Sequence, residues 1–325
     1  MPEATSEPGN AKTLLVKQIR SESPRVITLT LVDPAGEPFP PWEAGAHLDV
    51  ELPSGTIRQY SLCGDNQDKT SYTIAVQHEP AGRGGSHEVH TAPLIGKELT
   101  VRGPRNHFPL ISSEEHFLIA GGIGITPILA MARVLERTGQ RWQVVYCGHR
   151  RDMPFIDELR NVNPHRVTII ETDQQGRPDV RAVINQLPSD TAVYCCGPAS
   201  LISDISEACA ETDKGLTLRV ERFTADPQSR PLQTDGDTSI EVELAQSGTV
   251  ISVPADQTIL EAVREIRPDV PFSCEEGYCG SCETRVLDGT PDHRDEVLGT
   301  NERGRDGTMM ICVSRAKSQR LLLDL

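Results

Sequence analysis

The 325-residue sequence has no run of apolar residues that approaches the ~20 needed to cross a bilayer. Its start, Met1 to Lys12, is polar and lacks the apolar centre of a signal peptide. It has no stripe of Lys and Arg, and its net charge of −15 argues against binding to nucleic-acid phosphates. Nine cysteines, an odd number without a regular framework, argue against disulfides. These absences predict a cytoplasmic protein with reduced thiols that contacts neither membrane nor nucleic acid.

The length is enough for two or three domains, each with its own core. The acidic excess is uneven, because the stretch from Asp237 to Leu325 has 17 acidic and 9 basic residues. Two interpretations fit this stretch: a solvated surface that needs no partner, or a face that steers docking to a complementary protein.

Four cysteines near the C-terminus follow a C-x4-C-x2-C pattern with a distant fourth: Cys274, Cys279, Cys282 and Cys312. This is the plant-type [2Fe-2S] spacing, in which one loop supplies three thiolates and a later segment supplies the fourth. A zinc site would more usually have two C-x2-C pairs, and disulfides would need an oxidising compartment. The pattern therefore predicts one-electron transfer.

The chain changes character along its length. Short alternating segments between Leu14 and Gly103 predict an antiparallel β-barrel, and from Phe117 strands alternate with helices, which predicts a parallel α/β sheet. Thr224 to Thr238 has the composition of a linker, and a hairpin and a short helix, Ile259–Ile266, precede the cysteine loop. We therefore expect a barrel at 10–110, an α/β domain at 111–225, a linker at 226–238 and a β-grasp-like ferredoxin domain at 239–325.

A glycine turn follows the first strand of the α/β region and opens the expected helix Ile128–Leu135. Its residues Gly122, Gly124 and Thr126 would let a pyrophosphate approach the helix N-terminus, although strand-to-helix corners also use glycine for packing. A later strand ends at Cys196 and Gly197, before the expected helix Ser200–Cys209. Because ligands bind at the carboxyl ends of parallel strands, the glycine turn and the Cys196-Gly197 strand end are expected to line the same crevice. The alternative for Cys196 is a small buried hydrophobe.

Two barrel segments carry polar side chains suited to a phosphate and a ring system. In the first, Arg58-Gln59-Tyr60-Ser61-Leu62, an arginine could bind phosphate, a tyrosine could pack on a ring and a serine could bond its polar edge. The second, Gly82-Arg83-Gly84-Gly85-Ser86, could form a backbone nest for an anion. An exposed edge strand and a flexible turn are the respective alternatives.

Taken in order, these motifs resemble the phthalate dioxygenase reductase family, with the closest likeness to its vanillate O-demethylase reductase branch. The resemblance covers nearly the whole chain from Leu14. It rests on the two barrel segments, Gly103-Pro104-Arg105-Asn106-x-Phe108-Pro109-Leu110, Gly121-Gly122-Ile123-Gly124-Ile125-Thr126-Pro127, Cys196-Gly197-Pro198, Glu221-Arg222-Phe223 and the four cysteines.

The resemblance implies an FMN-binding barrel, an NAD(H)-binding domain and a [2Fe-2S] ferredoxin domain that together serve a separate Rieske-type oxygenase. It implies that the barrel residues Arg58, Tyr60, Ser61, Leu62, Gly84, Gly85 and Ser86 hold FMN. It assigns the nicotinamide cofactor to Gly122, Gly124, Thr126 and Gly197, and catalytic positions to Cys196, Glu221 and Phe223. A monomer is the default expectation.

In such a protein the flavin joins a hydride donor, which gives two electrons, to a cluster that accepts one. The hydride step needs no general acid or base, so we expect no catalytic triad, and we expect the Asp292-His293 pair to lie in a plain loop. Three alternatives stay open at this point: a haem or diiron acceptor, a redox-sensing module, and FAD in place of FMN. Two arginines in Cys147-Gly148-His149-Arg150-Arg151 also leave NADPH open beside NADH.

Overall fold

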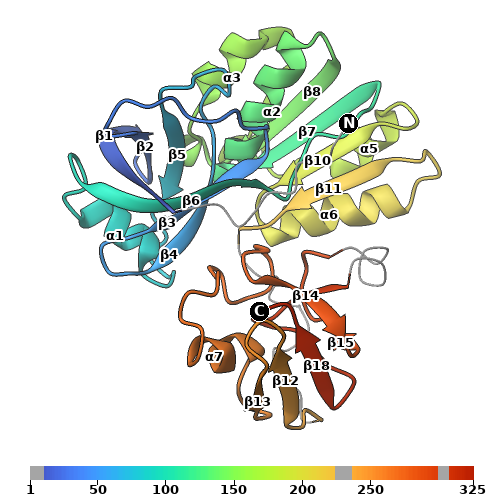
Figure 1. The fold of residues 1–325 in the computed structure, drawn as a ribbon. Helices are drawn as coiled ribbons and strands as arrows, with labels where there is room; N and C mark the ends of the chain where they lie inside the picture. Colours follow the sequence, from blue (N-terminus) through green and yellow to red (C-terminus); the bar gives the residue numbers. More distant parts are fainter. Residues whose placement is uncertain (1–10, 224–235, 299–306) are drawn as a thin grey trace. The chain divides into compact units, whose positions relative to one another are not determined.

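The structure is a computed structural model that describes residues 11–223, 236–298 and 307–325. The chain divides into two units, Met1–Arg222 and Phe223–Leu325 (Figure 1). The expected linker at 226–238 falls largely on 224–235, which lies outside the described residues. Within the described ranges, no helix is long and apolar enough to cross a membrane.

The first unit begins with a six-stranded antiparallel sheet and one short helix. Its strands are β1 (Lys12–Ser23), β2 (Val26–Val32), β3 (Ala46–Glu51), β4 (Ile57–Ser61), β5 (Tyr72–Gln77) and β6 (Glu98–Asn106), and its helix is α1 (Gly85–Thr91). The order is β4-β3-β6-β1-β2-β5, and a bridge between Leu62 and Ile74 joins the two edge strands. The expected antiparallel barrel is confirmed, because this bridge closes the sheet on itself.

A five-stranded parallel sheet follows in the same unit. Its strands are β7 (Glu115–Gly121), β8 (Arg141–Gly148), β9 (Val167–Glu171), β10 (Ala192–Cys196) and β11 (Thr217–Glu221), in the order β11-β10-β7-β8-β9. The helical segments are η1 (Gly122–Gly124), α2 (Ile125–Arg137), η2 (Arg150–Asp152), α3 (Ile156–Val162), η3 (Pro164–Arg166), α4 (Thr172–Gln175), α5 (Val180–Gln186) and α6 (Ala199–Ala210). Counted from β7, the order is 3-2-1-4-5 read from the β9 edge, the doubly wound arrangement that places ligands at the strands' carboxyl ends.

Successive side chains of the parallel strands point to opposite faces of the sheet, so the core has one part on each face. Phe117 and Ile119 of β7 lie in one buried cluster with Ile184 of α5 and Ile202 of α6. The opposite face packs against α2, whose first two turns are almost completely buried. In Figure 1, α2 lies on one side of the strands and α6 on the other. The expected α/β layer is therefore confirmed.

The second unit is a small mixed sheet with one helix. Its elements are β12 (Ile240–Leu244), β13 (Thr249–Val253), α7 (Ile259–Arg264), β14 (Glu283–Asp288), β15 (Pro291–Asp292), β16 (Thr308–Met310), β17 (Arg315–Ala316) and β18 (Arg320–Leu323). The main sheet has the order β13-β12-β18-β14-β16, with β12 and β18 parallel. The β12–β13 hairpin is confirmed, and this arrangement is the expected β-grasp-like fold.

Helix boundaries differ from the sequence expectation in both directions. Helix α2 starts at Ile125, three residues before the expected start, because a proline is tolerated in a helix's first turn. Helix α7 ends at Arg264, two residues before the expected end at Ile266. A capping box fixes the start of α7: the Thr258 hydroxyl accepts from the Glu261 N–H, and the Glu261 carboxylate accepts from the Thr258 N–H.

Candidate functional site

The four cysteines of the C-terminal pattern are all buried in the second unit. Cys274, Cys279 and Cys282 lie on the loop between α7 and β14, and Cys312 lies in the turn after β16. Their exposed fractions are between 3% and 7%. Cys282 and Cys312 also belong to the apolar core of this unit, so the two segments that carry the thiols are packed together.

The sulfur atoms lie within hydrogen-bonding reach of one another and of backbone N–H groups. The Cys274 thiol contacts those of Cys279 and Cys312, and Cys312 also contacts Cys282. The N–H of Cys274 donates to Sγ of Cys279 at 3.4 Å, and the N–H of Glu276 donates to Sγ of Cys274 at 3.3 Å. Such N–H groups stabilise negative charge on sulfur and are one factor that sets a cluster's potential.

The donor set fits a two-iron cluster. In the described parts of the chain, no group of three or more His, Cys, Asp or Glu residues is arranged to hold a metal ion. A [2Fe-2S] cluster makes a different demand, because each of its irons takes two thiolates. The hydrogen bond with Cys274, together with burial, raises the pKa of the Cys279 thiol. Without a cation between them these sulfurs are therefore poor thiolates, and a bound cluster would supply the compensating positive charge.

The local backbone explains why this loop contains glycine. Gly277 has a φ of +76°, and a Cβ there would lie 2.7 Å from Cγ2 of Val313. Glu275 adopts a φ of 58° although it has a side chain, which is exposed. Backbone strain in a non-glycine residue is uncommon and is found preferentially at functional sites. The loop that carries three of the four thiols therefore contains a left-handed backbone conformation at Glu275 as well as at Gly277.

A second group of predicted residues lies at the carboxyl ends of the parallel strands. The loop after β7 and the loop after β10 pack backbone against backbone: a Cβ on Gly124 would lie 2.2 Å from the carbonyl oxygen of Cys196. A Cβ on Gly197 would lie 2.9 Å from the backbone nitrogen of Gly121. Glycine is required at these positions for the two strand ends to meet, which is the packing role that the sequence left open.

Gly122 differs from these neighbours. Its φ is +55°, and an added Cβ would meet nothing within 4 Å. It begins η1, the short turn that leads into the N-terminus of α2, where free N–H groups and the helix dipole favour an anion. The hydroxyl of Thr126 donates to the carbonyl of Ile123 at 3.1 Å, and only 2% of this residue is exposed. The structure thus leaves Gly122 open to a ligand, while the Thr126 side chain is engaged in the turn.

The two barrel motifs meet at the start of α1. A Cβ on Gly85 would lie 2.8 Å from the Arg58 side chain, and Arg58 Nη2 donates to the carbonyl of Arg83 at 3.3 Å. Gly84 has a φ of +86° with open space around it, and the Ser86 hydroxyl accepts from the N–H of Glu79 at 3.0 Å. The structure therefore brings Arg58 and the loop 82–86 together, a contact that their sequence separation did not reveal.

The residues after Arg58 have unequal exposure. Tyr60 is partly buried, and burial raises the pKa of its hydroxyl. Leu62 lies entirely within the barrel core at 0% exposure, so its side chain supports the strand and any ligand contact there would come from the backbone. Ser61 is buried, with its hydroxyl directed at the parallel-sheet domain.

Ser61, Cys196 and Glu221 converge where the barrel meets the parallel sheet. The Ser61 hydroxyl donates to Oε2 of Glu221 at 3.3 Å, and the Cys196 thiol lies 4.0 Å from the same oxygen. Burial raises the pKa of Glu221 to about 8, although the hydrogen bond from Ser61 lowers it in part. Burial, and then the nearby Glu221, raise the pKa of Cys196 well above its usual range. At neutral pH the cluster is therefore a neutral acid, a neutral thiol and a hydroxyl.

Sequence reasoning did not predict this contact, because it joins residues 160 positions apart. The resemblance had assigned Ser61 to FMN and Glu221 to a catalytic position, without a contact between them. The third predicted catalytic residue, Phe223, is the first residue of the second unit and does not belong to this convergence within the first unit.

Sequence reasoning missed two further sets of polar contacts. At the ends of β8 and β9, Arg150 forms an ion pair with Glu171, and the Arg150 N–H donates to Oδ1 of Asp173 at 3.1 Å. In the second unit, the expectation of a plain loop at Asp292-His293 was wrong for Asp292, whereas His293 lies outside any helix or strand. Asp292 belongs to β15 and forms a buried ion pair with Arg294. No local sequence signal pointed to this network, because Arg294 meets Asp237 across 57 positions.

Two family models match the chain. One describes a 2Fe-2S iron-sulfur cluster binding domain and matches residues 242–317. The other describes an oxidoreductase NAD-binding domain and matches residues 118–207. These matches cover the cysteine pattern and the glycine-lined strand ends, respectively.

Curated relatives match nearly end to end. The chain is 41% identical over 302 residues to phthalate dioxygenase reductase of Burkholderia cepacia, covering 91% of each chain. It is 38% identical over 318 residues to the vanillate O-demethylase oxidoreductase of a Pseudomonas species, covering 96% of this chain and 99% of the other.

Solved structures match as well. A phthalate dioxygenase reductase, described as a modular structure for electron transfer from pyridine nucleotides to [2Fe-2S], has a TM-score of 0.70 and 38% identity, covering 97% of this chain and 98% of that one. A type IV self-sufficient cytochrome P450 monooxygenase has a TM-score of 0.88 and 39% identity. All of this chain matches it, but the match spans only 43% of the longer P450 chain.

Proposed function

The chain belongs to the phthalate dioxygenase reductase family, and from that premise we propose that it is the reductase component of a Rieske non-haem iron oxygenase system. It passes electrons from NADH through FMN and a [2Fe-2S] cluster to a separate oxygenase of the aromatic-ring dioxygenase or O-demethylase type. The observation that carries this proposal is the presence, in one chain, of a four-thiol cluster site and a nucleotide-type strand edge against a barrel. Each of these supplies one stage of the transfer.

The cofactors supply the redox chemistry: NADH gives a hydride, FMN accepts two electrons and releases them singly, and the cluster carries one. The residues of the chain hold and orient these groups. Cys274, Cys279, Cys282 and Cys312 are the iron ligands. The open backbone at Gly122 and the N-terminus of α2 receive the pyrophosphate, because both present N–H groups without side-chain obstruction.

The FMN phosphate belongs at the start of α1. Arg58 carries the positive charge there, the backbone at Gly84 leaves space for an anion, and Gly85 and Ser86 follow it in the first turn of α1. Tyr60 and Ser61 would hold the ring system. Ser61 also contacts Glu221, and Cys196 lies near the same carboxyl group, so these residues link the flavin strand to the strand ends that would hold the nicotinamide.

The role of that convergence is orientation. Hydride transfer needs no general base, but it requires the two rings to be held in contact without water. Burial raises the pKa of Glu221 to about 8, which favours its neutral form, so it would add no charge beside the rings and could donate a hydrogen bond there. Cys196 and Ser61 would add only small neutral groups. Phe223, two residues after Glu221, belongs to the second unit, and its catalytic role stays a prediction.

The contacts of Arg150 favour NADH over NADPH. A 2′-phosphate is normally bound by a nearby arginine, whereas an acidic residue binds the ribose hydroxyl of NAD. Here Arg150 is already paired with Glu171, and Asp173 accepts from its backbone N–H. Both acidic groups lie at the strand ends beside a pocket of about 370 Å³ that Arg150 and Glu171 help to line. They would repel a phosphate group at this position.

One observation favours a second acceptor class. The match to the P450 monooxygenase covers the whole of this chain, so the same three-part architecture also occurs in a haem enzyme. We place the oxygenase first because the relatives that match over nine-tenths of their own length are reductases of dioxygenase and demethylase systems. We further propose that the protein is cytoplasmic, since none of its nine cysteines is paired in a disulfide, and that it is a monomer.

A test of the acceptor is reduction, under anaerobic conditions, of purified Rieske oxygenases and of a P450 haem domain by the reductase and NADH. The proposal predicts stoichiometric bleaching of a Rieske centre and slow or no reduction of the haem. Preferential reduction of the haem would establish the second acceptor class. If the protein oxidised NADH with ferricyanide but reduced neither the Rieske oxygenases nor the haem domain, its reductase activity would be upheld and the oxygenase assignment contradicted.

A further inference from the structure

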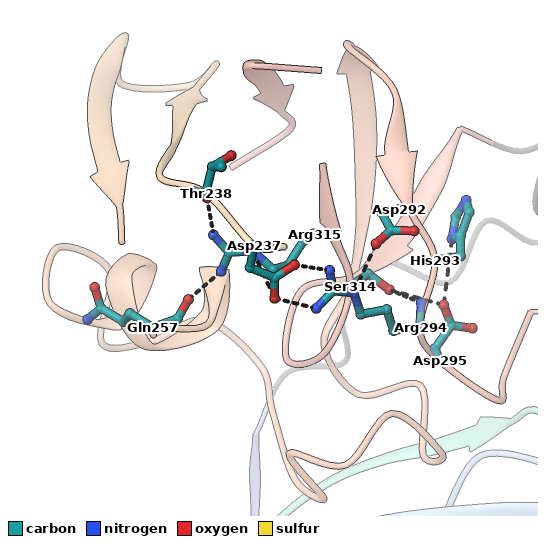
Figure 2. A network of polar contacts seen from close by, with 9 residues as sticks. All are labelled: Asp237, Thr238, Gln257, Asp292, His293, Arg294, Asp295, Ser314 and Arg315. Atoms are coloured by element: carbon teal, nitrogen blue, oxygen red, sulfur yellow. Dashed lines mark hydrogen bonds and ion pairs between the residues drawn. The ribbon is translucent and has the colours of Figure 1, made fainter. Parts of the chain in front are cut away.

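A polar network with a buried centre lies in the second unit and includes residues next to the turn that carries the fourth cysteine. Figure 2 shows its nine residues as sticks. Arg294 is at its centre: Nη1 donates to Oδ2 of Asp237 at 2.7 Å, and Nε donates to Oδ2 of Asp292 at 2.9 Å. The Arg294 side chain is 3% exposed. Burying an arginine between two carboxylates is tolerated only where the geometry satisfies all three charges.

Asp295 lies on the other side of this network. Its side chain is completely buried, at 0% exposure. Oδ1 accepts from the Ser314 hydroxyl at 3.2 Å, and Oδ2 accepts from the N–H of Leu298 at 2.8 Å. Nδ1 of His293 is 3.6 Å from Oδ1. Hydrogen bonds to both oxygens hold the carboxyl group in a single orientation.

These contacts join the two segments that carry the cluster ligands. Ser314 is two residues after Cys312, and its hydroxyl also accepts from the N–H of Arg294 at 3.1 Å. On the other side, the N–H of Glu296 donates to the carbonyl of Gly277 at 2.8 Å, and a Cβ on Gly277 would lie 3.2 Å from Cα of Asp295. Asp295 therefore lies where the loop with three cysteines meets the turn with the fourth.

On the basis of the proposed cluster, we propose that Asp295 is a positioning residue of the iron-sulfur site. It holds the Cys312 turn against the Cys274–Cys282 loop through Ser314, while its neighbour Glu296 fixes the loop through Gly277. It also places a buried carboxylate beside the site. Reduction of the cluster adds one negative charge, so this carboxylate disfavours the reduced form and keeps the reduction potential low.

Asp292 provides a matched control. Like Asp295 it is a buried aspartate in the same network, three residues away, but its carboxylate pairs with Arg294. Asp292→Asn removes the same charge while leaving the contact between Asp295 and Ser314. A nonspecific effect of charge or of network stability would appear in both variants. An effect of position would appear in the Asp295 variant alone.

The experiment compares wild type, Asp295→Asn and Asp292→Asn as full-length holoprotein. The readouts are the midpoint potential of the cluster, its EPR g values and the rate of iron loss to a chelator. We expect Asp295→Asn to shift the one-electron equilibrium threefold to tenfold toward the reduced form, where tenfold corresponds to about 59 mV. Iron loss should be about tenfold faster, the g values should change, and Asp295→Glu should restore part of both properties.

If Asp295→Asn fails to retain a cluster, Ser314→Ala tests the same contact without removing a charge. It should accelerate iron loss with a smaller change in potential. Unchanged potential and iron loss in Asp295→Asn would overturn the inference, as would equal changes in Asp292→Asn, or no change in iron loss in Ser314→Ala. Wild-type protein that takes up no [2Fe-2S] cluster on reconstitution would instead refute the proposed function from which the inference starts.

Discussion

The two units of the chain build their sites by opposite means. In the first unit the site is made of strand ends and glycines, and its polar side chains at the Ser61–Glu221 contact are neutral at pH 7. In the second unit the site is made of four buried thiols supported by charged side chains that are also buried. A coenzyme that arrives and leaves needs an open backbone surface, whereas a resident cluster needs an enclosed cage. The two sites should therefore fail differently when they are altered.

The largest effect is expected from a cluster ligand. Cys279→Ser should abolish the cluster, because its thiol lies within the buried contacts of the four sulfurs. The first unit should still oxidise NADH with ferricyanide at close to the wild-type rate. Iron content and EPR check the first expectation, and steady-state kinetics checks the second. Cys209→Ser, in the half-buried part of α6, is the control and should retain full iron. An iron-free variant that had also lost NADH oxidation would contradict the separation of the two sites.

The next effect distinguishes a glycine that meets the ligand from one that only turns the chain. Gly122→Ala and Gly139→Ala both place a side chain at positive φ with nothing within 4 Å, so each should destabilise the protein by about 1–2 kcal/mol. Only Gly122→Ala should also lower kcat/KM for NADH, by about 10- to 100-fold, because a methyl group there obstructs the pyrophosphate. Denaturant unfolding and kinetics measure the two quantities. Equal kinetic losses would show that Gly122 has no special role.

A separate effect, on the pH dependence of stability, concerns the neutral acid. The pKa of Glu221 is about 8 in the folded protein against an ordinary 4.5, so between these values the folded state holds the extra proton. The free energy of unfolding should therefore fall as pH rises from about 4.5 to about 8, with no contribution to the slope outside that window. Glu221→Gln should remove this part of the pH dependence, while exposed Glu37→Gln should leave it intact. Urea unfolding at several pH values measures this dependence. If the free energy of unfolding changed with pH by the same slope in all three proteins, the raised pKa of Glu221 would be contradicted.

The smallest effect is on the choice of coenzyme. Glu171→Gln frees Arg150 and removes a negative charge, so the ratio of kcat/KM for NADPH over NADH should rise about threefold to tenfold, roughly 0.7–1.4 kcal/mol. Asp157→Asn removes a charge from the lining of the same pocket without touching that pair and should leave the ratio unchanged. A ratio that rose equally in both variants would indicate a general field effect.

Local signals were sufficient for the fold and for the identity of the cluster site. The change from alternating strands to strand-helix units, and the cysteine spacing, correspond directly to the two sheets of the first unit and the buried loop of the second. The missed features are contacts between distant residues. Ser61 and Glu221 are 160 positions apart, and Arg294 meets Asp237 across 57. No periodicity or spacing encodes such pairs, and the Asp292-His293 segment looked like a loop because its partners were not visible.

The central claim is that one chain carries electrons from NADH through its flavin to its cluster. Its most direct test is anaerobic rapid mixing of the holoprotein with NADH, followed by absorbance of the flavin and of the iron-sulfur centre, with EPR of frozen samples. The account predicts that the flavin bleaches first and that the cluster is then reduced within the same molecules, at a rate independent of protein concentration. A cluster that stayed oxidised while the flavin was fully reduced would contradict the account.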